Sequence, residues 1–226
     1  MKKFLVLLLA LMMMASSAFA LEISEPGVLH ATPENAAKIQ ARFEGIDCVV
    51  GVGGGTICDL CKYATHYADA ENPKPLIVVE TALSVNAFSD DASVMLISGV
   101  KRTVHSRYPD ILIIDLDIQA AAPAEMNVSG YGDLIATWTA PVDWYLANVL
   151  GMGKNFSSIP SDMIRDQCRA LLANSEKLAA GTDYKVLEDL ANALTLSGLA
   201  MGLGGESSPA SGSEHVMSHL IDMTTG

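Results

Sequence analysis

The segment Asp47-Cys-Val-Val-Gly-Val-Gly-Gly-Gly-Thr-Ile-Cys-Asp-Leu-Cys-Lys62 places a β-branched apolar run directly before three consecutive glycines and a helix-forming run. This order predicts a strand, a tight turn and a helix. Glycine has no Cβ, so the turn lets a ligand approach the backbone, and the N–H groups at the helix start attract negative charge. The glycine spacing fits neither a Walker A loop nor a Gly-x-Gly-x-x-Gly fingerprint. A phosphate-binding turn and a purely structural turn both stay open from this segment alone.

Two more short apolar runs, Leu76–Glu80 and Ile111–Asp115, are expected to be buried strands of the same sheet. Thr32-Pro33 marks a helix start, with Thr at the N-cap and Pro at the first helical position, and that helix is expected to run to about Phe43. Strands and helices that alternate in this way predict a parallel sheet with helices on its faces.

From residue 123 onward the pattern becomes helical. Gly130 and the residues after it are expected to open one helix, and the spacing alone favours Asp133 as its N-cap. The ranges Asp162–Ala180 and Asp183–Met201 repeat apolar residues with a period near 3.6, which predicts two more helices.

The composition is that of a globular protein, with 226 residues, 50% of them hydrophobic, and a formal net charge of −12. The predicted organisation is a partial α/β domain over residues 21–122 and a helical domain over residues 123–226, with a small-molecule site in the cleft between them. The negative charge argues against nucleic acid and anionic membrane surfaces as partners. A local basic cluster could still hold a phosphorylated substrate; it consists of Lys101, Arg102, His105 and Arg107.

Residues 1–20 have the features of a Sec-type signal peptide. Two lysines precede the apolar run Phe4–Met14, and an Ala-x-Ala pattern ends at Ala20. The apolar run is too short to anchor the chain in a bilayer. We therefore expect cleavage after Ala20 and an exported, periplasmic protein; a cytoplasmic location would follow if this N-terminus is a gene-call or rearrangement artefact.

The four cysteines would permit disulfides in an exported protein. Cys58 and Cys61 form a Cys-x-x-Cys pair, but the chain has no second such pair for a zinc site. Because this pair falls in the predicted turn and helix, we expect small buried thiols.

Polar side chains of interest follow the second predicted strand and also occur near the end of the chain. Thr81, Ser84 and Asn86 could hydrogen-bond a ligand at the carboxyl end of an open sheet, or could serve ordinary turn chemistry. His215 and His219 are four residues apart, so they share one face of a helix. On its own such a pair is more often incidental than a metal site.

Taken in order, these motifs resemble the sn-glycerol-1-phosphate dehydrogenase group of the iron-containing alcohol dehydrogenase and dehydroquinate synthase-like superfamily. The resemblance covers roughly residues 46 to 222. It implies a Rossmann-like parallel sheet, incomplete at its N-terminal side, followed by an all-helical domain. The motifs that carry it are Gly51–Tyr63, Thr81–Phe88, Asp115–Asp117 with Ala122–Asn127, Ser129–Leu134, Asp143-Trp144, and Ser197–Met201 running into Ser208–His215.

The resemblance also implies the site residues and the cofactors. The cofactor would be NAD or NADP, and the metal Zn²⁺ or another divalent ion such as Fe²⁺ or Ni²⁺. The residues implied for the cofactor are Gly53, Gly54, Gly55, Thr56 and Asp59 at the pyrophosphate, and Thr81, Ser84 and Asp90 towards the nicotinamide. The metal ligands would be Asp133 and His215, the substrate-binding residues Asn86, Asp133 and His219, and the catalytic set Asp133, His215 and His219.

The implied activity is the interconversion of dihydroxyacetone phosphate and sn-glycerol 1-phosphate, a step of phospholipid metabolism. The implied partner is a small phosphorylated polyol or ketose, with no nucleic acid, no membrane after signal cleavage, and a homo-oligomer left open. Two alternatives stay open: a truncated, non-catalytic relic or exported binding module of the same fold, and a dehydroquinate synthase-like lyase.

The sequence departs from the family pattern in several places. Glu80 stands where the family usually has proline, and Asp90 replaces a small hydroxyl residue. The family's third metal ligand, a histidine, is expected beyond Gly226, and about 32 residues between Ala20 and Gly53 are too few for the adenine-side half. We therefore expect a chain that is truncated at both ends.

Overall fold

The computed structural model describes residues 29–153, 155–181 and 183–225. The expected signal peptide, residues 1–20, lies outside the described residues. None of the helices in the described part of the chain combines the length and the apolar character needed to cross a membrane.

Three parallel strands form the sheet at the centre of the first half, in the order β1-β2-β5. They are β1 (Val49–Gly53), β2 (Leu76–Glu80) and β5 (Ile111–Ile114). The register aligns Gly53, Glu80 and Ile114 at the carboxyl end, which is where a parallel sheet presents side chains to a ligand. The three predicted strands and their parallel arrangement are confirmed.

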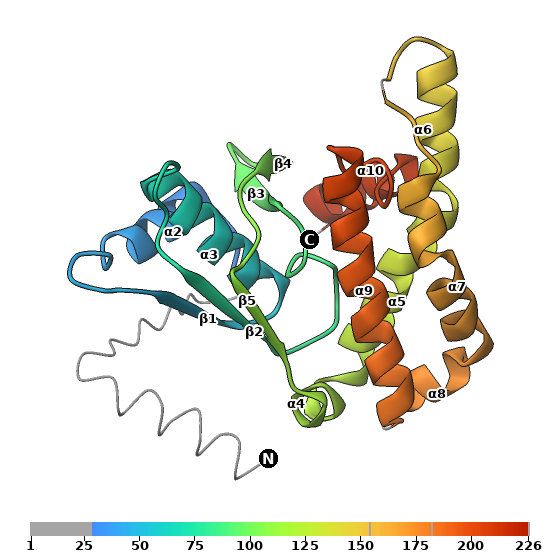
Figure 1. Cartoon of the computed structure of the whole chain (residues 1–226), viewed down its shortest axis with the longest axis horizontal. Coiled ribbons are helices and arrows are strands. Elements are labelled where there is room, and N and C mark those ends of the chain that lie inside the picture. The colour runs from blue at the N-terminus through green and yellow to red at the C-terminus, as the bar shows by residue number, and fades with distance from the viewer. Residues whose placement is uncertain (1–28, 154, 182, 226) are drawn as a thin grey trace.

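Helices α2 (Pro33–Gln40) and α3 (Gly55–Ala68) lie along one face of this sheet (Figure 1). The Thr32 hydroxyl accepts a hydrogen bond from Asn35 N at 3.2 Å, which confirms the predicted N-cap. The first helix ends at Gln40 rather than near Phe43, because the amide of Phe43 bonds to the carbonyl three residues back and tightens the last turn.

We expected helices on both faces of the sheet, and the face opposite α2 and α3 does not meet this expectation. Val50, Val52 and Ile111 are 38%, 43% and 51% exposed. Within the described ranges this face therefore presents apolar side chains that no helix covers.

An antiparallel hairpin between β2 and β5 was not predicted. It consists of β3 (Ala92–Ile97) and β4 (Val100–His105), joined by Ser98 and Gly99, both with positive φ (53° and 78°). Two residues in this conformation match the twist of paired strands. Ser93 Oγ donates to the Asp59 carbonyl at 3.1 Å and ties the hairpin to α3.

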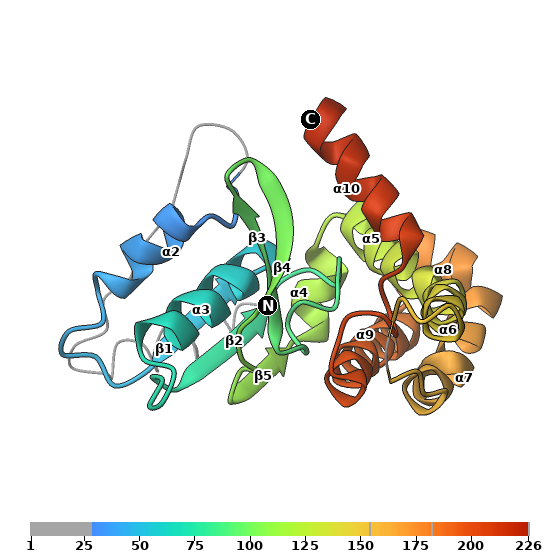
Figure 2. The same cartoon turned by 90° about the horizontal axis from the view of Figure 1, so that it is seen from above.

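The second half consists of helices and packs beside the sheet half in both views (Figures 1 and 2). Together with the sheet half it confirms the predicted fold class. Its elements are α4 (Leu116–Ala121), α5 (Ala124–Ile135), the 3₁₀ turn η1 (Ala136–Trp138), α6 (Ala140–Val149), α7 (Ile159–Ala173), α8 (Ser175–Ala180), α9 (Tyr184–Gly204) and α10 (Ser213–Thr225).

Two helix boundaries correct the sequence-based expectations. Helix α5 starts at Ala124 behind Pro123, so Gly130 lies inside it and Asp133 is not an N-cap. The predicted helix over Asp162–Ala180 is divided at Asn174, whose backbone leaves the helical region (φ −117°, ψ 18°) and whose side-chain amide donates to the Ala170 carbonyl at 2.9 Å. A side chain that bonds a nearby carbonyl competes with the helix ladder, which accounts for the break.

Close backbone contacts hold the two halves together. A Cβ built on Gly130 of α5 would overlap the Leu83 carbonyl oxygen, and one on Gly198 of α9 would overlap Ser89. Asn127 Oδ1 accepts from Leu83 N at 3.3 Å, and Ser89 Oγ donates to the Leu194 carbonyl at 3.1 Å. The segment after β2 is therefore fixed against both α5 and α9.

Candidate functional site

The glycine turn joins β1 to α3, as predicted. Gly54 is the N-cap of α3, and no side chain caps the first turn. Apart from the adjacent backbone, a Cβ on Gly54 would meet one atom of the described residues within 4 Å, Glu80 Oε1 at 3.8 Å. The helix start thus offers backbone N–H groups and open space, which fits a bound anion.

The neighbouring glycines have packing roles. A Cβ on Gly53 would lie 2.5 Å from Ile57 Cγ1, and one on Gly55 would lie 2.6 Å from Val85 Cγ2. Gly53 and Gly55 therefore have structural roles in this turn, and binding of a ligand at Gly54 stays a prediction. Thr56 is exposed in the first turn of α3, and Thr81 N donates to the Gly53 carbonyl at 3.0 Å, which brings Thr81 beside the turn.

Asp59 and Asp90 lie inside the protein around Lys62, whose exposed fraction is 0%. Lys62 Nζ pairs with Asp90 Oδ1, donates to the Ala92 carbonyl, and lies 3.9 Å from Asp59 Oδ1. Burial raises the pKa of Asp59 to about 7, although Lys62 opposes this shift, and burial also raises the pKa of Asp90. Sequence reasoning missed Lys62, although its position three residues after Asp59 was a signal. The contact of both carboxyl groups with a cofactor stays a prediction.

Asn86 links the segment after β2 to the long helix α9. Its Nδ2 donates to Ser197 Oγ at 3.1 Å and lies 3.3 Å from Met201 Sδ. Ser84 is half-buried in the same segment, and its amide donates to the Ala82 carbonyl at 2.9 Å.

Asp133 and His215 are in direct contact, although they come from α5 and α10. His215 Nε2 lies 3.1 Å from Asp133 Oδ1, and His215 Nδ1 lies 2.9 Å from Glu214 Oε1. The hydrogen bond to Asp133 raises the pKa of His215, burial opposes this, and Glu214 adds to the increase. Sequence reasoning missed Glu214, which orients the imidazole from the second nitrogen.

The start of α10 is anchored to α6. Ser213 N donates to Asp143 Oδ2 at 2.8 Å, and Gly212 N donates to Glu214 Oε1 at 2.8 Å. A Cβ on Gly212 would lie 2.9 Å from Ala140 Cα, so the chain can enter α10 here only with glycine. These contacts fix the direction in which His215 points.

His219 follows one turn later, with its ring centroid 6.4 Å from that of His215. Burial lowers the pKa of His219, and Lys101 and His215 lower it further. Lys101 of β4 also pairs with Asp222 at 2.7 Å, so the hairpin reaches α10.

The predicted basic cluster does not form a single patch. Lys101 pairs with α10, while Arg107 Nη2 pairs with Asp110 Oδ2 at 2.7 Å and Arg107 Nη1 donates to the Lys74 carbonyl at 2.8 Å. Through Asp222, Lys101 contacts the helix that carries His215 and His219.

The Asp133–His215 pair supplies a carboxylate oxygen and an imidazole nitrogen, the donor types that suit Zn²⁺ or Fe²⁺. The described part of the chain contains no group of three histidine, cysteine, aspartate or glutamate side chains that could hold a metal. The pair therefore fits two positions of a metal site, and a third ligand would have to come from elsewhere. The described cysteines are free, and Cys58 and Cys61 are buried thiols as predicted.

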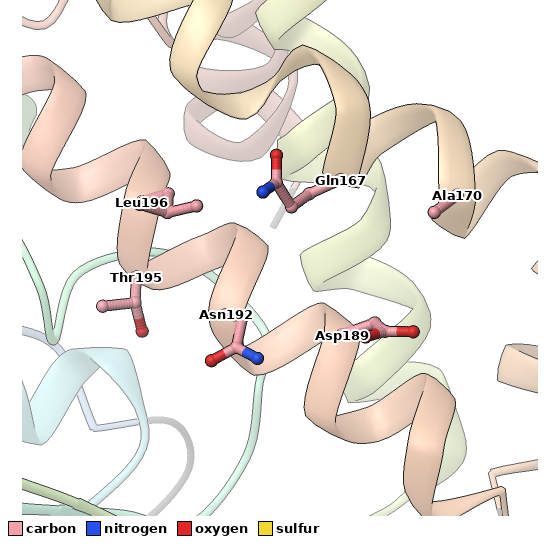
Figure 3. A pocket seen from close by; sticks show the side chains of 6 residues that line it. All are labelled: Gln167, Ala170, Asp189, Asn192, Thr195 and Leu196. Carbon is pink, nitrogen blue, oxygen red and sulfur yellow. The ribbon is translucent and has the colours of Figure 1, made fainter.

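Two hollows lie away from these residues. One, of about 410 Å³, is an open hollow between α7 and α9 (Figure 3). The other, of about 290 Å³, lies beside η1, α6 and α7. None of the predicted site residues lines either of them. The lining of the first consists of Gln167, Ala170, Asp189, Asn192, Thr195 and Leu196.

Residues 11–123, which include the glycine turn and the segment after β2, match the model of a protein family described as iron-containing alcohol dehydrogenase. The chain belongs to this family. The family model covers the sheet half, and the resemblance inferred from the motifs is thereby confirmed.

Relatives within the iron-containing alcohol dehydrogenase family extend the likeness into the helical half. The chain is 32% identical over 178 residues to glycerol-1-phosphate dehydrogenase [NAD(P)+] of Geobacillus thermodenitrificans, covering 79% of this chain and 43% of the relative. It is 33% identical over 181 residues to the protein of the same name from Thermococcus sibiricus, covering 80% of this chain and 50% of that one. The chain thus spans about half the length of these relatives.

Solved structures show the same fold. Glycerol dehydrogenase from Schizosaccharomyces pombe superposes with a TM-score of 0.66 at 20% identity, covering 86% of this chain and 50% of that one. Sulfoacetaldehyde reductase from Bifidobacterium kashiwanohense, solved with NAD+, gives a TM-score of 0.71 at 17% identity over 99% of this chain and 62% of that one. At these identities the likeness concerns the fold alone.

Proposed function

We propose that the protein is an NAD(P)- and metal-dependent polyol-phosphate dehydrogenase that interconverts dihydroxyacetone phosphate and sn-glycerol 1-phosphate. The observation that carries this proposal is the contact between Asp133 Oδ1 and His215 Nε2 at 3.1 Å. Two typical metal-ligand side chains from distant parts of the sequence meet there, and the relatives of 32–33% identity are glycerol-1-phosphate dehydrogenases.

Asp133 and His215 would hold the metal, with Glu214 orienting the imidazole through Nδ1. When bound, a divalent ion supplies Lewis-acid polarisation of a substrate oxygen, and the nicotinamide supplies or accepts the hydride. His219, whose pKa is lowered, stays neutral near neutral pH and can accept a hydrogen bond from a substrate hydroxyl. Lys101, which pairs with Asp222 and lowers the pKa of His219, would contribute positive charge near a phosphorylated substrate.

The cofactor would bind at the carboxyl end of the sheet. The uncapped start of α3 at Gly54 would hold the pyrophosphate through backbone N–H groups, with Thr56 in its first turn. Thr81 and Ser84, at the beginning of the next segment, would face the nicotinamide side. Asp59 and Asp90 would contribute indirectly, because their contacts with Lys62 hold α3 and this segment together.

The activity is tested with the purified full chain, loaded in turn with Zn²⁺, Fe²⁺ and Ni²⁺. We expect dihydroxyacetone phosphate to cause oxidation of NADH or NADPH, seen as a loss of absorbance. Metal and dinucleotide binding without turnover would instead favour the non-catalytic binding module. A dehydroquinate synthase-like lyase would act on its own substrate and leave dihydroxyacetone phosphate unchanged.

The metal role of His215 gives a separate prediction. His215→Ala is expected to weaken metal retention by more than the roughly 10–100-fold that loss of a ligand's hydrogen-bond partner causes, because a direct ligand is removed. Elemental analysis after dialysis measures the metal content. His219→Ala is the matched control on the same helix face and is expected to keep the metal. An unchanged metal content in His215→Ala would contradict the assignment.

A further inference from the structure

The side chain of Glu80 is a buried acid at the centre of the carboxyl end of the sheet. It is the last residue of β2, paired with Gly53 on one side and Ile114 on the other, and its exposed fraction is 0%. Its backbone carbonyl accepts from Gln119 Nε2 at 2.7 Å. The strand register and this bond fix the residue in place.

The two carboxyl oxygens of Glu80 have different surroundings. Oε2 accepts a hydrogen bond from the Cys58 thiol at 3.0 Å, whereas Oε1 is buried and has no hydrogen-bond partner among the described residues. A buried oxygen without a hydrogen-bond partner destabilises the folded protein, and it does so more strongly when it is charged. Oε1 would therefore be stabilised by binding a proton, or by a hydrogen-bond partner that the described residues do not supply.

The unpartnered oxygen faces the glycine turn. It lies 3.8 Å from the position that a Cβ on Gly54 would occupy, and no other atom of the described residues beyond the adjacent backbone comes within 4 Å. Gly54 is the N-cap of α3, and no described side chain caps the first N–H groups of this helix. A negative Glu80 and a bound pyrophosphate would compete for the same positive helix end, and they would repel each other because both are anions.

We propose that Glu80 couples binding of the dinucleotide pyrophosphate to the uptake of one proton, an inference that rests on the proposed cofactor site. With the proton on Oε1, the carboxyl group is neutral and can donate a hydrogen bond to a pyrophosphate oxygen. The neutral carboxyl group no longer repels the pyrophosphate, and Oε1 gains a hydrogen-bond partner. The proton comes from solvent, and no covalent bond to the ligand forms or breaks.

The charged and titratable groups around Glu80 are compatible with this role. Helix α3 contributes the Cys58 thiol, whose pKa burial raises, together with Lys62 and Asp59; α4 contributes the neutral Gln119. Burial raises the pKa of Glu80 to about 7, while the Cys58 thiol, the nearby backbone amide of Ala82 and then Lys62 lower it. The carboxyl group thus changes its charge near neutral pH.

The direction of the pH effect follows from linkage. An anion binds better to the protonated form, so it raises the pKa of Glu80 further, and affinity falls as pH rises above the pKa of the free protein. With one linked proton and a starting pKa of about 7, the Kd should rise by up to about 30-fold between about pH 6 and about pH 8.5.

The test is calorimetric titration of the full chain with NAD+, whose pyrophosphate keeps a constant charge over this range, unlike the 2′-phosphate of NADP. Titrations in two buffers of different ionisation enthalpy count the protons taken up. We expect close to one proton near pH 8 in the unaltered protein. Glu80→Gln, which keeps size and hydrogen-bonding ability, should take up about one proton fewer and should bind more tightly at high pH. Glu34→Gln, an exposed control on α2, should behave like the unaltered protein.

NAD+ binding that is independent of pH, or an equal proton uptake in Glu80→Gln and in the unaltered protein, would overturn the role of Glu80 and leave the cofactor site intact. Absence of NAD+ binding in all three proteins at every pH would overturn both this role and the proposed cofactor site. If Glu80→Gln folds poorly, the absence of proton uptake when the unaltered protein binds NAD+ would still overturn the role of Glu80.

Discussion

Replacing Lys62 by methionine is expected to lower the free energy of unfolding by about 3–5 kcal/mol near neutral pH, the range measured when one partner of a buried ion pair is removed. Lys62 is completely buried, and its ammonium group pairs with Asp90 and lies 3.9 Å from Asp59 Oδ1. Methionine fills a similar volume but leaves two carboxyl groups in the interior without a positive charge.

The effect of Lys62→Met should depend on pH. The folded-state pKa of Asp59 is raised from 3.8 to about 7, so its contribution to stability is full at low pH and is lost as pH rises through about 7. Without Lys62 the pKa values of Asp59 and Asp90 rise further, and this loss extends to higher pH. The difference between variant and unaltered protein should therefore be small near pH 4 and should grow as pH rises.

Denaturant unfolding at about pH 5 and about pH 8 measures both parts of this prediction. Lys185→Met is the matched control, because Lys185 also has two helical carboxylate partners, Glu188 at 3.2 Å and Asp189 at 2.9 Å, but lies at the surface. Exposed ion pairs contribute little to stability because solvent screens them, so the control should change little. Equal losses in the two variants would show that the buried cluster does not stabilise the fold.

Gly130→Ala is expected to destabilise the protein by about 3 kcal/mol, the upper part of the range for overpacking, because its Cβ would overlap the Leu83 carbonyl oxygen. A backbone carbonyl group, unlike a flexible side chain, cannot rotate away from the added Cβ. Helix α5 and the segment after β2 would have to move apart, which would also disturb the bond from Leu83 N to Asn127 Oδ1.

Gly132→Ala, in the same helix, supplies the control. Beyond the helix's own backbone, no atom of the described residues lies within 4 Å of a Cβ at this position, and alanine is favoured over glycine in a helix by about 1 kcal/mol. The two substitutions should therefore change the unfolding midpoint in opposite directions. Destabilisation of similar size in both would show that the contact between α5 and Leu83 is not tight in solution.

Much of the sheet half could be predicted because its signals are local. The strand β2, the N-cap at Thr32 and the turn before α3 each depend on residues within a few positions of one another. The hairpin of β3 and β4 had a local signal too, the Ser98-Gly99 turn, but the polar residues around it were assigned to ligand binding.

The helical half shows where local signals fail. The glycines near Asp133 suggest a helix start, but α5 continues through them because Gly130 is needed for contact with the Leu83 carbonyl. That contact joins residues that are distant in the sequence, and no pattern around Gly130 reveals it. The partner of Asp59 was missed for a similar reason, since only burial turns Lys62 from a surface charge into the centre of a cluster.

The sequence by itself determined the three strands, the uncapped glycine turn and the common helix face of His215 and His219, because each depends on backbone preference and periodicity over a few residues. Only the tertiary structure decided that His215 meets Asp133, and that the free oxygen of Glu80 faces Gly54. Both contacts depend on how separate elements pack, and packing is set by the fit of distant surfaces.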